Sequence, residues 1–127
     1  MKDLLIAFLT ILLLIGGWLT FIHYADSQSK NFQEDIEKKI IPGIAAENWD
    51  ETDKRLNRLD KDWHEFRKIS LFFLDTHTIN EIDFGLAKSI EYAHAQDVSN
   101  STGELAAMVE QLSFLTENES LSLQNVF

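Results

Sequence analysis

The sequence has no cysteine and is poor in proline and glycine. Without cysteine among its 127 residues, the chain can form neither a disulfide framework nor a thiol-dependent active site, and it cannot carry a lipid on an N-terminal cysteine. One proline and five glycines are too few for the many tight turns of a β-sandwich. These absences favour a helical fold.

Basic side chains are also scarce, and the shortage is uneven. The formal net charge is −10; residues 26–74 hold 9 basic and 11 acidic side chains, whereas residues 75–127 hold one basic residue, Lys88, against 9 acidic ones. Because such a surface repels phosphate groups, we expect no nucleic-acid partner and no flat contact of this half with an anionic bilayer. The acidic half is either a solvated face or a patch that recruits a basic partner or cations.

A long apolar segment occupies the N-terminus. Residues 4–22 contain no ionisable side chain, and as a helix these 19 residues are about 28 Å long, close to the thickness of bilayer hydrocarbon. A cleaved signal usually has a shorter apolar region and a small-x-small cleavage site; here His23 precedes Ala25 by two residues. Trp18 and Tyr24 suit the headgroup layer. We therefore predict a retained transmembrane signal-anchor over residues 1–25, with a cleaved signal and a buried soluble helix as alternatives.

The flanking charges do not agree on orientation. Only Lys2 precedes the span, whereas Lys30, Lys38 and Lys39 follow it, which by itself would favour a cytoplasmic C-terminus. Long C-terminal domains, however, are translocated largely regardless of charge, and a short N-terminal stub suits a signal-anchor. We expect residues 26–127 to form an extracytoplasmic, acidic helical bundle at the cell membrane.

Apolar residues behind the span recur at helical spacing. A short helix is expected to end at residues 40–43, "IIPG", because proline disfavours helical geometry in the residue before it. Capping boxes at Thr78/Glu81 and Ser101/Glu104 predict the starts of two later helices, separated by a polar loop, "QDVSNST". The tail "ENESLSLQNVF" is too short and too rich in serine for a helix to be predicted, but its Leu121, Leu123, Val126 and Phe127 could close the end of the bundle. The four expected buried stripes comprise Phe32, Ile36 and Ile40; Trp49, Thr52, Leu56, Leu59, Trp63, Phe66, Ser70 and Phe73, on a helix over residues 50–75; Ile79, Ile82, Leu86, Ile90 and Ala93; and Leu105, Met108, Val109, Leu112 and Leu115. The fold class is thus all-α, with a transmembrane helix followed by a small antiparallel bundle of three to four helices.

This order of features resembles the small bacterial membrane-anchored proteins of domain-of-unknown-function family 4363. The matching features are the span, Trp49 followed by "RLNRLDKDW" ending at Trp63, "FLDTH" before a helix with "GLAKSIEY", and the ending "LSLQNVF". The family usually has Asp-His-x-Glu-Ile at the turn, and the chain departs from this pattern because Thr76 separates Asp75 from His77. The resemblance implies an all-helical, membrane-tethered domain and assigns no activity.

Catalytic clusters are not apparent in the sequence. Glu91 and His94 form a single Glu-x-x-His, whereas a di-iron bundle needs two such motifs and two further glutamates. Asp60 and His64 are one helical turn apart and are expected to form a solvent-facing pair. There is no Gly-x-Ser-x-Gly elbow or glycine-rich phosphate loop. We expect no enzyme activity and no cofactor.

Two kinds of binding site remain as hypotheses. Gly16 and Thr20 are a small-xxx-small pair that would let a second transmembrane helix approach, for self-association or for a membrane-protein partner; Trp18 and, at the end of the bundle, Trp49 are further contact candidates. The favoured function is a membrane-anchored adaptor. The alternative is a sensor for a divalent cation or small ligand at the acidic turn, where the weak candidate ligands are Asp75, His77 and Glu81, with Asp83 nearby.

Overall fold

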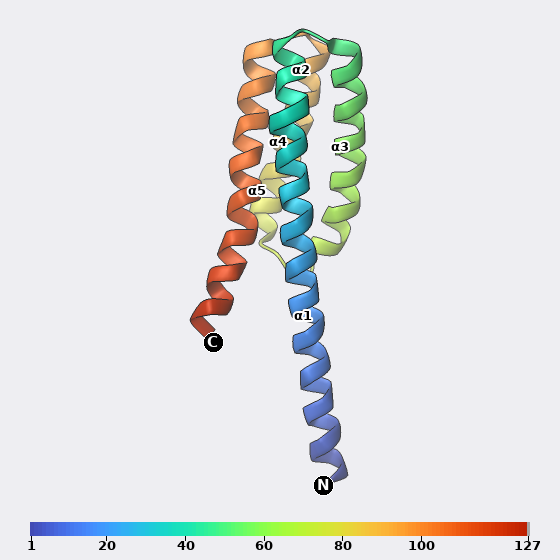
Figure 1. Ribbon diagram of the computed structural model, residues 1–127, viewed down its shortest axis with the longest axis vertical. Helices are drawn as coiled ribbons and strands as arrows, with labels where there is room; N and C mark the ends of the chain where they lie inside the picture. The colour runs from blue at the N-terminus through green and yellow to red at the C-terminus, as the bar shows by residue number, and fades with distance from the viewer. Residues whose placement is uncertain (127) are drawn as a thin grey trace.

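The structure is a computed structural model that describes the backbone of residues 1–126 and the side chains of residues 1–117. All regular elements in this part of the chain are helical (Figure 1). They are α1 (Lys2–Asp35), the π-helical η1 (Ile36–Ile40), α2 (Ile41–Ala45), α3 (Trp49–Ser70), α4 (Thr76–His94) and α5 (Val98–Val126). The expected all-α fold is confirmed.

The helices form an antiparallel bundle at one end of a long N-terminal helix. The chain ascends through α1, η1 and α2, descends through α3, ascends through α4 and descends through α5 (Figure 1). α5 packs against both α1 and α4, and α3 packs against α4 and against the upper part of the first helix. Short connections between antiparallel neighbours produce this up-down order.

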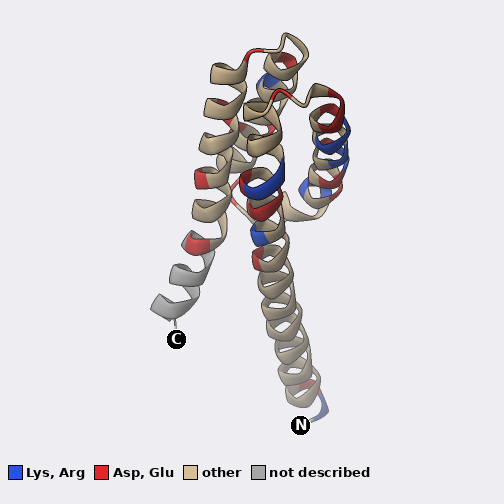
Figure 2. Ribbon diagram, turned by 45° about the horizontal axis from the view of Figure 1, so that its top comes forward, with Lys and Arg blue, Asp and Glu red and all other residues tan. Residues whose placement is uncertain are grey.

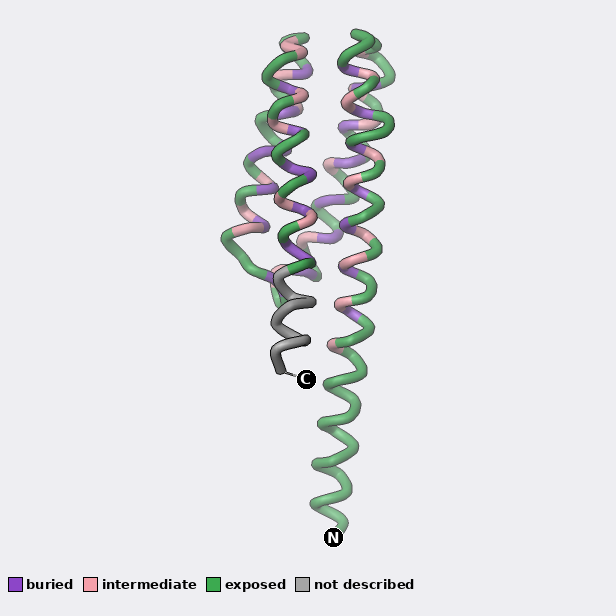
Figure 3. Tube along the Cα trace, turned by 60° about the vertical axis from the view of Figure 1, so that its left-hand side comes forward, coloured by how far each residue is buried: buried purple, intermediate pink, exposed green. Residues whose placement is uncertain are grey.

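The first helix has two different halves. Lys2–Ala45 is one continuous helix of 44 residues, the only one in the described chain that is long and apolar enough to cross a membrane. Its N-terminal half is exposed, and its second half is buried on one side (Figure 3). The buried positions recur every three or four residues: Phe21, Ala25, Ser29, Phe32, Ile36, Ile40 and Ile44. The core therefore begins inside the segment predicted to span the membrane.

The expected stop at residues 40–43 is wrong, because the helix continues past Pro42 to Ala45. In a regular α-helix the ring of Pro42 would collide with the carbonyl of Lys38, four residues earlier. The chain instead widens into a π-helical turn just before the proline, where the Ile41 N–H donates to the Ile36 carbonyl. The wider turn also keeps Ile36 and Ile40 fully buried on the same side as Ile44.

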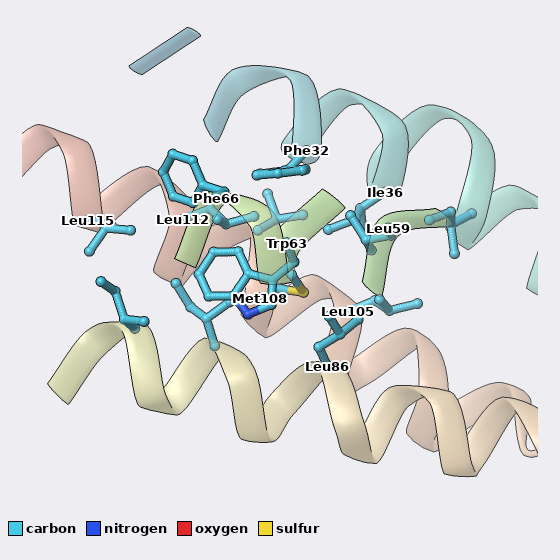
Figure 4. Packing of buried hydrophobic residues seen from close by; sticks show 14 of the residues in the cluster. Phe32, Ile36, Leu59, Trp63, Phe66, Leu86, Leu105, Met108, Leu112 and Leu115 are labelled. Carbon is cyan, nitrogen blue, oxygen red and sulfur yellow. The ribbon is translucent and has the colours of Figure 1, made fainter. Parts of the chain in front are cut away.

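The core lies along the bundle axis and confirms most of the expected stripes. Trp63 and Phe66 of α3 lie against Phe32 of α1, with ring centroids 6.2 and 5.6 Å from it (Figure 4). The whole predicted stripe of α5 is buried, as are four of the five predicted residues of α4, and Ile90 is partly buried. In the stripe of α3, Phe73 differs: the helix ends at Ser70, and Phe73 lies in the following turn, 40% exposed.

Both predicted capping boxes are wrong by about one turn. α4 begins at Thr76, and the carboxylate of Asp75 accepts the Thr78 N–H at 3.1 Å. α5 begins at Val98, and Asp97 accepts the Asn100 N–H at 3.1 Å, so most of the expected polar loop is helix. An aspartate before each threonine or serine offers a stronger acceptor for the first-turn N–H groups.

The ends of α2 and α4 explain why the loops are so short. Glu47 and Gln96, just after each helix, both have φ of 56°. The N–H of Glu47 bonds to Ile44 and that of Asn48 to Gly43, which is the Schellman arrangement, and the same pattern follows α4. Neither position is a glycine, so the sequence does not mark these ends. α5 extends through Val126 and so includes most of the tail, for which no helix was predicted. The side chains expected to close the bundle end (Leu121, Leu123, Val126 and Phe127) lie outside those described.

We predict that Thr52→Val stabilises the bundle. The Thr52 hydroxyl is buried and has no hydrogen-bond partner. It faces Gly43, and a Cβ added to this glycine would lie 2.9 Å from the hydroxyl oxygen. Removing an unsatisfied buried hydroxyl while keeping the side chain's shape should raise the free energy of unfolding by about 1 kcal/mol. Denaturant titration would measure the change. The matched control is Thr102→Val, which removes a hydroxyl that donates to the Val98 carbonyl at 2.7 Å and should therefore not be stabilising. Equal effects of the two substitutions would contradict the prediction.

Candidate functional site

The turn between α3 and α4 lies beside the end of the exposed half of α1. The ring of Phe73, in this turn, lies 4.3 Å from the ring of Phe21 and 5.8 Å from that of Trp18, centroid to centroid. The candidate contact residue Trp18 is therefore partly buried within the chain itself. These aromatic contacts attach the bundle to the apolar helix at the point where the helix leaves it.

The candidate pair Gly16 and Thr20 stays open on the surface of α1. The Thr20 hydroxyl donates to the Gly16 carbonyl at 2.8 Å, and a Cβ built on Gly16 would meet nothing within 4 Å. No part of the described bundle covers this face. It is available to lipid or to a second helix.

Trp49 lies at the opposite end of the bundle. It lines a shallow hollow together with Asp50, Asp53, Ala93, His94 and Gln96. Nε2 of His94 is 3.0 Å from a carboxylate oxygen of Asp53, so this histidine pairs across α3 and α4 and not with Glu91. Both partners are about half exposed, and such surface pairs contribute little to stability.

The acidic turn divides into local contacts. The carboxylate of Asp75 accepts from both the backbone N–H and the hydroxyl of Thr78, and Nε2 of His77 lies 3.1 Å from Glu81. Asp83 faces α3 instead. Among the side chains of residues 1–117, no three His, Asp or Glu side chains are arranged to hold a metal ion. The geometry thus gives Asp75 a role at the start of α4 and brings no support to the sensor hypothesis.

Asp75 should make the stability of the bundle depend on pH. The side-chain hydroxyl of Thr78 and then its backbone N–H lower the pKa of Asp75, and the N–H and amide of Asn100 lower the pKa of Asp97 in the same way. Each folded-state pKa lies below the unfolded value, about 4. The stabilisation is therefore complete above pH 4 and is lost as the pH falls through the folded-state pKa.

We predict that Asp75→Asn weakens this acid sensitivity. Thermal unfolding measured at pH 7 and at successively lower pH should show a smaller drop in Tm for the variant, because asparagine caps the helix without titrating. Asp75→Ala should lower Tm at pH 7 as well. Asp62→Asn, at an exposed position of α3 with no hydrogen bond in the described contacts, is the control. An unchanged pH profile in Asp75→Asn would contradict the prediction.

Asp83 is a contact point that the sequence did not reveal. Its Oδ1 accepts the indole N–H of Trp63 at 3.1 Å, and Arg67 and His64 approach the same oxygen at 4.0 and 3.7 Å. His64 also lies 3.3 Å from Asp60, so the expected solvent-facing pair exists within a larger cluster. The cluster joins α3 to α4 near the core. Asp83 and Trp63 are 20 residues apart in the chain, so no local sequence pattern predicts their contact.

A second surface that the sequence did not single out follows the outer face of α4 and α5. Two large aromatic side chains are exposed on this face: Phe84 of α4 is 64% exposed and Phe114 of α5 is 58% exposed. Between them run two adjoining hollows that share Glu81 and Gln111. The remaining lining residues are His77, Thr78, Gly85, Lys88, Glu104 and Glu110. The surface combines two aromatic side chains with carboxylates.

The fold and these contacts define a class of protein: an antiparallel helical bundle continuous with an apolar N-terminal helix. The chain belongs to the family described as Domain of unknown function (DUF4363), whose sequence profile matches residues 19–126. The match begins just before Phe21, where the core begins. No significant match is found among curated proteins or among solved structures.

Proposed function

We propose that this protein is a non-enzymatic, membrane-anchored adaptor whose bundle presents a helical surface to a membrane-protein partner. The observation that carries the proposal is the continuity of the first helix. Its N-terminal half exposes an apolar surface on all sides, and its second half is part of the bundle core. A bundle joined to its anchor by a continuous helix, and not by a flexible linker, is held in a defined position relative to the membrane.

Several features support a retained anchor over a cleaved signal. Ala25 is 1% exposed, and cleavage next to it would cut through a helix that packs in the core and would remove Phe21. The hydroxyls of Thr10 and Thr20 donate to carbonyls of their own helix, so neither would enter lipid unsatisfied. Figure 2 shows that the long stretch of α1 between its first turn and the bundle carries no acidic or basic side chain. We further propose that the bundle is extracytoplasmic, because the short N-terminal stub suits a signal-anchor and long C-terminal domains are translocated largely regardless of charge.

The partner's chemistry follows from the outer face of α4 and α5. Phe84 on α4 and Phe114 on α5 offer two exposed aromatic anchors, and Glu81, Glu104 and Glu110 line the hollows between them. Only Lys88 offsets this charge, and it lies 3.6 Å from Glu104. A helix with apolar and basic side chains complements such a face. The open face of Gly16 supplies a second contact, inside the membrane.

Crosslinking in the native membrane tests the proposal. A photoreactive amino acid at Phe84, Phe114 or Gly16, followed by mass spectrometry, should recover a defined membrane protein. The same group at Ala46, exposed in the distal loop, is the matched control. Products limited to the protein itself, or the same products from Ala46, would argue against an adaptor. A mature N-terminus at Ala25 or Asp26 would argue against the anchor.

A further inference from the structure

We propose that the turn between α3 and α4 is a second membrane contact, inserted into the interface of the same bilayer that holds α1. The proposed contact comprises residues 69–74, "ISLFFL", which are the last two residues of α3 and the turn after it, and its most exposed member is Phe72, 84% exposed. Ile69 and Phe73 are 47% and 40% exposed. The inference rests on the proposed anchor, and it adds a lipid-binding site that the anchor alone does not require.

The depth of the turn follows from its contacts with α1. Phe73 packs on Phe21 and Trp18, which are one and four residues before Ile22, the last residue of the apolar span. At the rise of an α-helix these positions lie about 1.5 and 6 Å inside the end of the span. If residues 4–22 fill the hydrocarbon, Phe73 and the adjacent Phe72 lie at the boundary between hydrocarbon and headgroups.

The backbone of the turn is suited to an apolar environment. The four consecutive N–H groups of residues 71–74 all donate within the chain, to the carbonyls of Arg67, Ile69 and Ser70. Pairing these N–H donors within the chain removes their share of the desolvation penalty when the turn enters the interface. Leu74, 6% exposed, fixes the end of the turn in the core.

The side chains around the turn match a lipid surface better than a protein partner. The exposed apolar surface of Phe72 and Phe73 continues, through Trp18, into that of α1, so one environment can cover both. Lys68, exposed in the last turn of α3, lies on the headgroup side of Phe72. Aromatic rings at the interface with a lysine beside them are the usual arrangement of residues that fix a protein in a bilayer.

Spin labelling of the full chain in vesicles tests the inference, and the absence of cysteine makes each introduced cysteine unique. Single variants Phe72→Cys, Phe8→Cys and Ala46→Cys would carry a nitroxide label in vesicles of phosphatidylcholine and phosphatidylglycerol. All three positions are exposed, so the bundle should fold in each variant, which circular dichroism would check. Power saturation would compare collisions with oxygen, which enters lipid, and with a water-soluble nickel chelate.

We expect the oxygen-to-nickel collision ratio at position 72 to exceed that at position 46 several-fold, and to approach that at position 8. A lipid-like ratio at position 8 with a water-like ratio at position 72 would overturn the second contact and leave the anchor intact. Water-like ratios at both positions would overturn the anchor and the second contact together. Dipolar broadening at position 72 would show that a second copy covers the turn, and would also overturn the inference.

Discussion

Trp63→Ala is expected to lower the free energy of unfolding by about 3–5 kcal/mol. The side chain is 0% exposed, and its ring packs on Phe66 and Phe32 with centroid distances of 5.7 and 6.2 Å. Truncation would leave a cavity where α1, α3 and α4 meet. It would also remove the donor at 3.1 Å from Asp83. Because small domains are stable by only about 5–15 kcal/mol, this loss is a large part of the total.

Denaturant unfolding of the full chain in detergent micelles, followed by circular dichroism, would measure the change. Trp63→Phe keeps most of the ring but loses the indole N–H, and should cost less, about 1–2 kcal/mol. Trp49→Ala is the matched control, since Trp49 is only partly buried and lies at the edge of the core. Its effect should stay near about 1 kcal/mol. Equal losses for Trp49→Ala and Trp63→Ala would contradict the central role of Trp63.

Removing residues 1–25 is expected to destabilise the bundle by about 2–3 kcal/mol relative to a chain that begins at Leu19. The shorter chain lacks Phe21, which is 8% exposed, and Ala25, which is 1% exposed. It also uncovers Phe73, whose ring lies 4.3 Å from that of Phe21. The chain that begins at Leu19 retains all of these contacts and the whole segment that matches the family.

Thermal and denaturant unfolding of the two purified chains would measure this difference. Phe21→Ala in the longer chain should reproduce most of the loss, and Leu19→Ala, at a position that is 50% exposed, should have little effect. If the chain beginning at Asp26 were as stable as the one beginning at Leu19, the core would not extend into the apolar segment. A cleaved signal would then fit the protein as well as an anchor does.

The buried stripes were predictable because helical periodicity is a local property. On α5, the spacing of Leu105, Met108 and Leu112 places them on one side of any regular helix, and each is 0% exposed. The same reasoning located Trp63 and Phe66 in the core. Family membership, expected from short motifs along the chain, is likewise confirmed over residues 19–126.

Helix ends were predicted less well because several residues compete for the same role. Asp75 and Thr78 can each cap a helix, and the aspartate does so, with Thr78 as its donor. Glu47 and Gln96 end their helices in a left-handed conformation that most side chains disfavour. Pro42 marked the end of a helix in the sequence, yet the π-helical turn before it absorbs the steric conflict.

The candidate contact residues also divide into those that the local sequence predicts and those that it does not. The apolar span and the open pair Gly16 and Thr20 are visible in the sequence, because both depend on neighbouring residues of one helix. The link between Trp63 and Asp83 joins residues 20 apart, and that between Trp18 and Phe73 joins residues further apart still. The distance between such partners along the chain carries no periodic signal.

By itself, the sequence determined that the chain is helical and acidic, that it opens with an apolar helix, and which face of each later helix is buried. Each of these properties follows from composition or from spacing within a few residues. Only the tertiary structure decided that the core reaches back to Phe21, that Asp83 meets Trp63, and that Phe73 lies against Trp18. These depend on how four antiparallel helices pack side by side, which brings together residues that are distant in the chain.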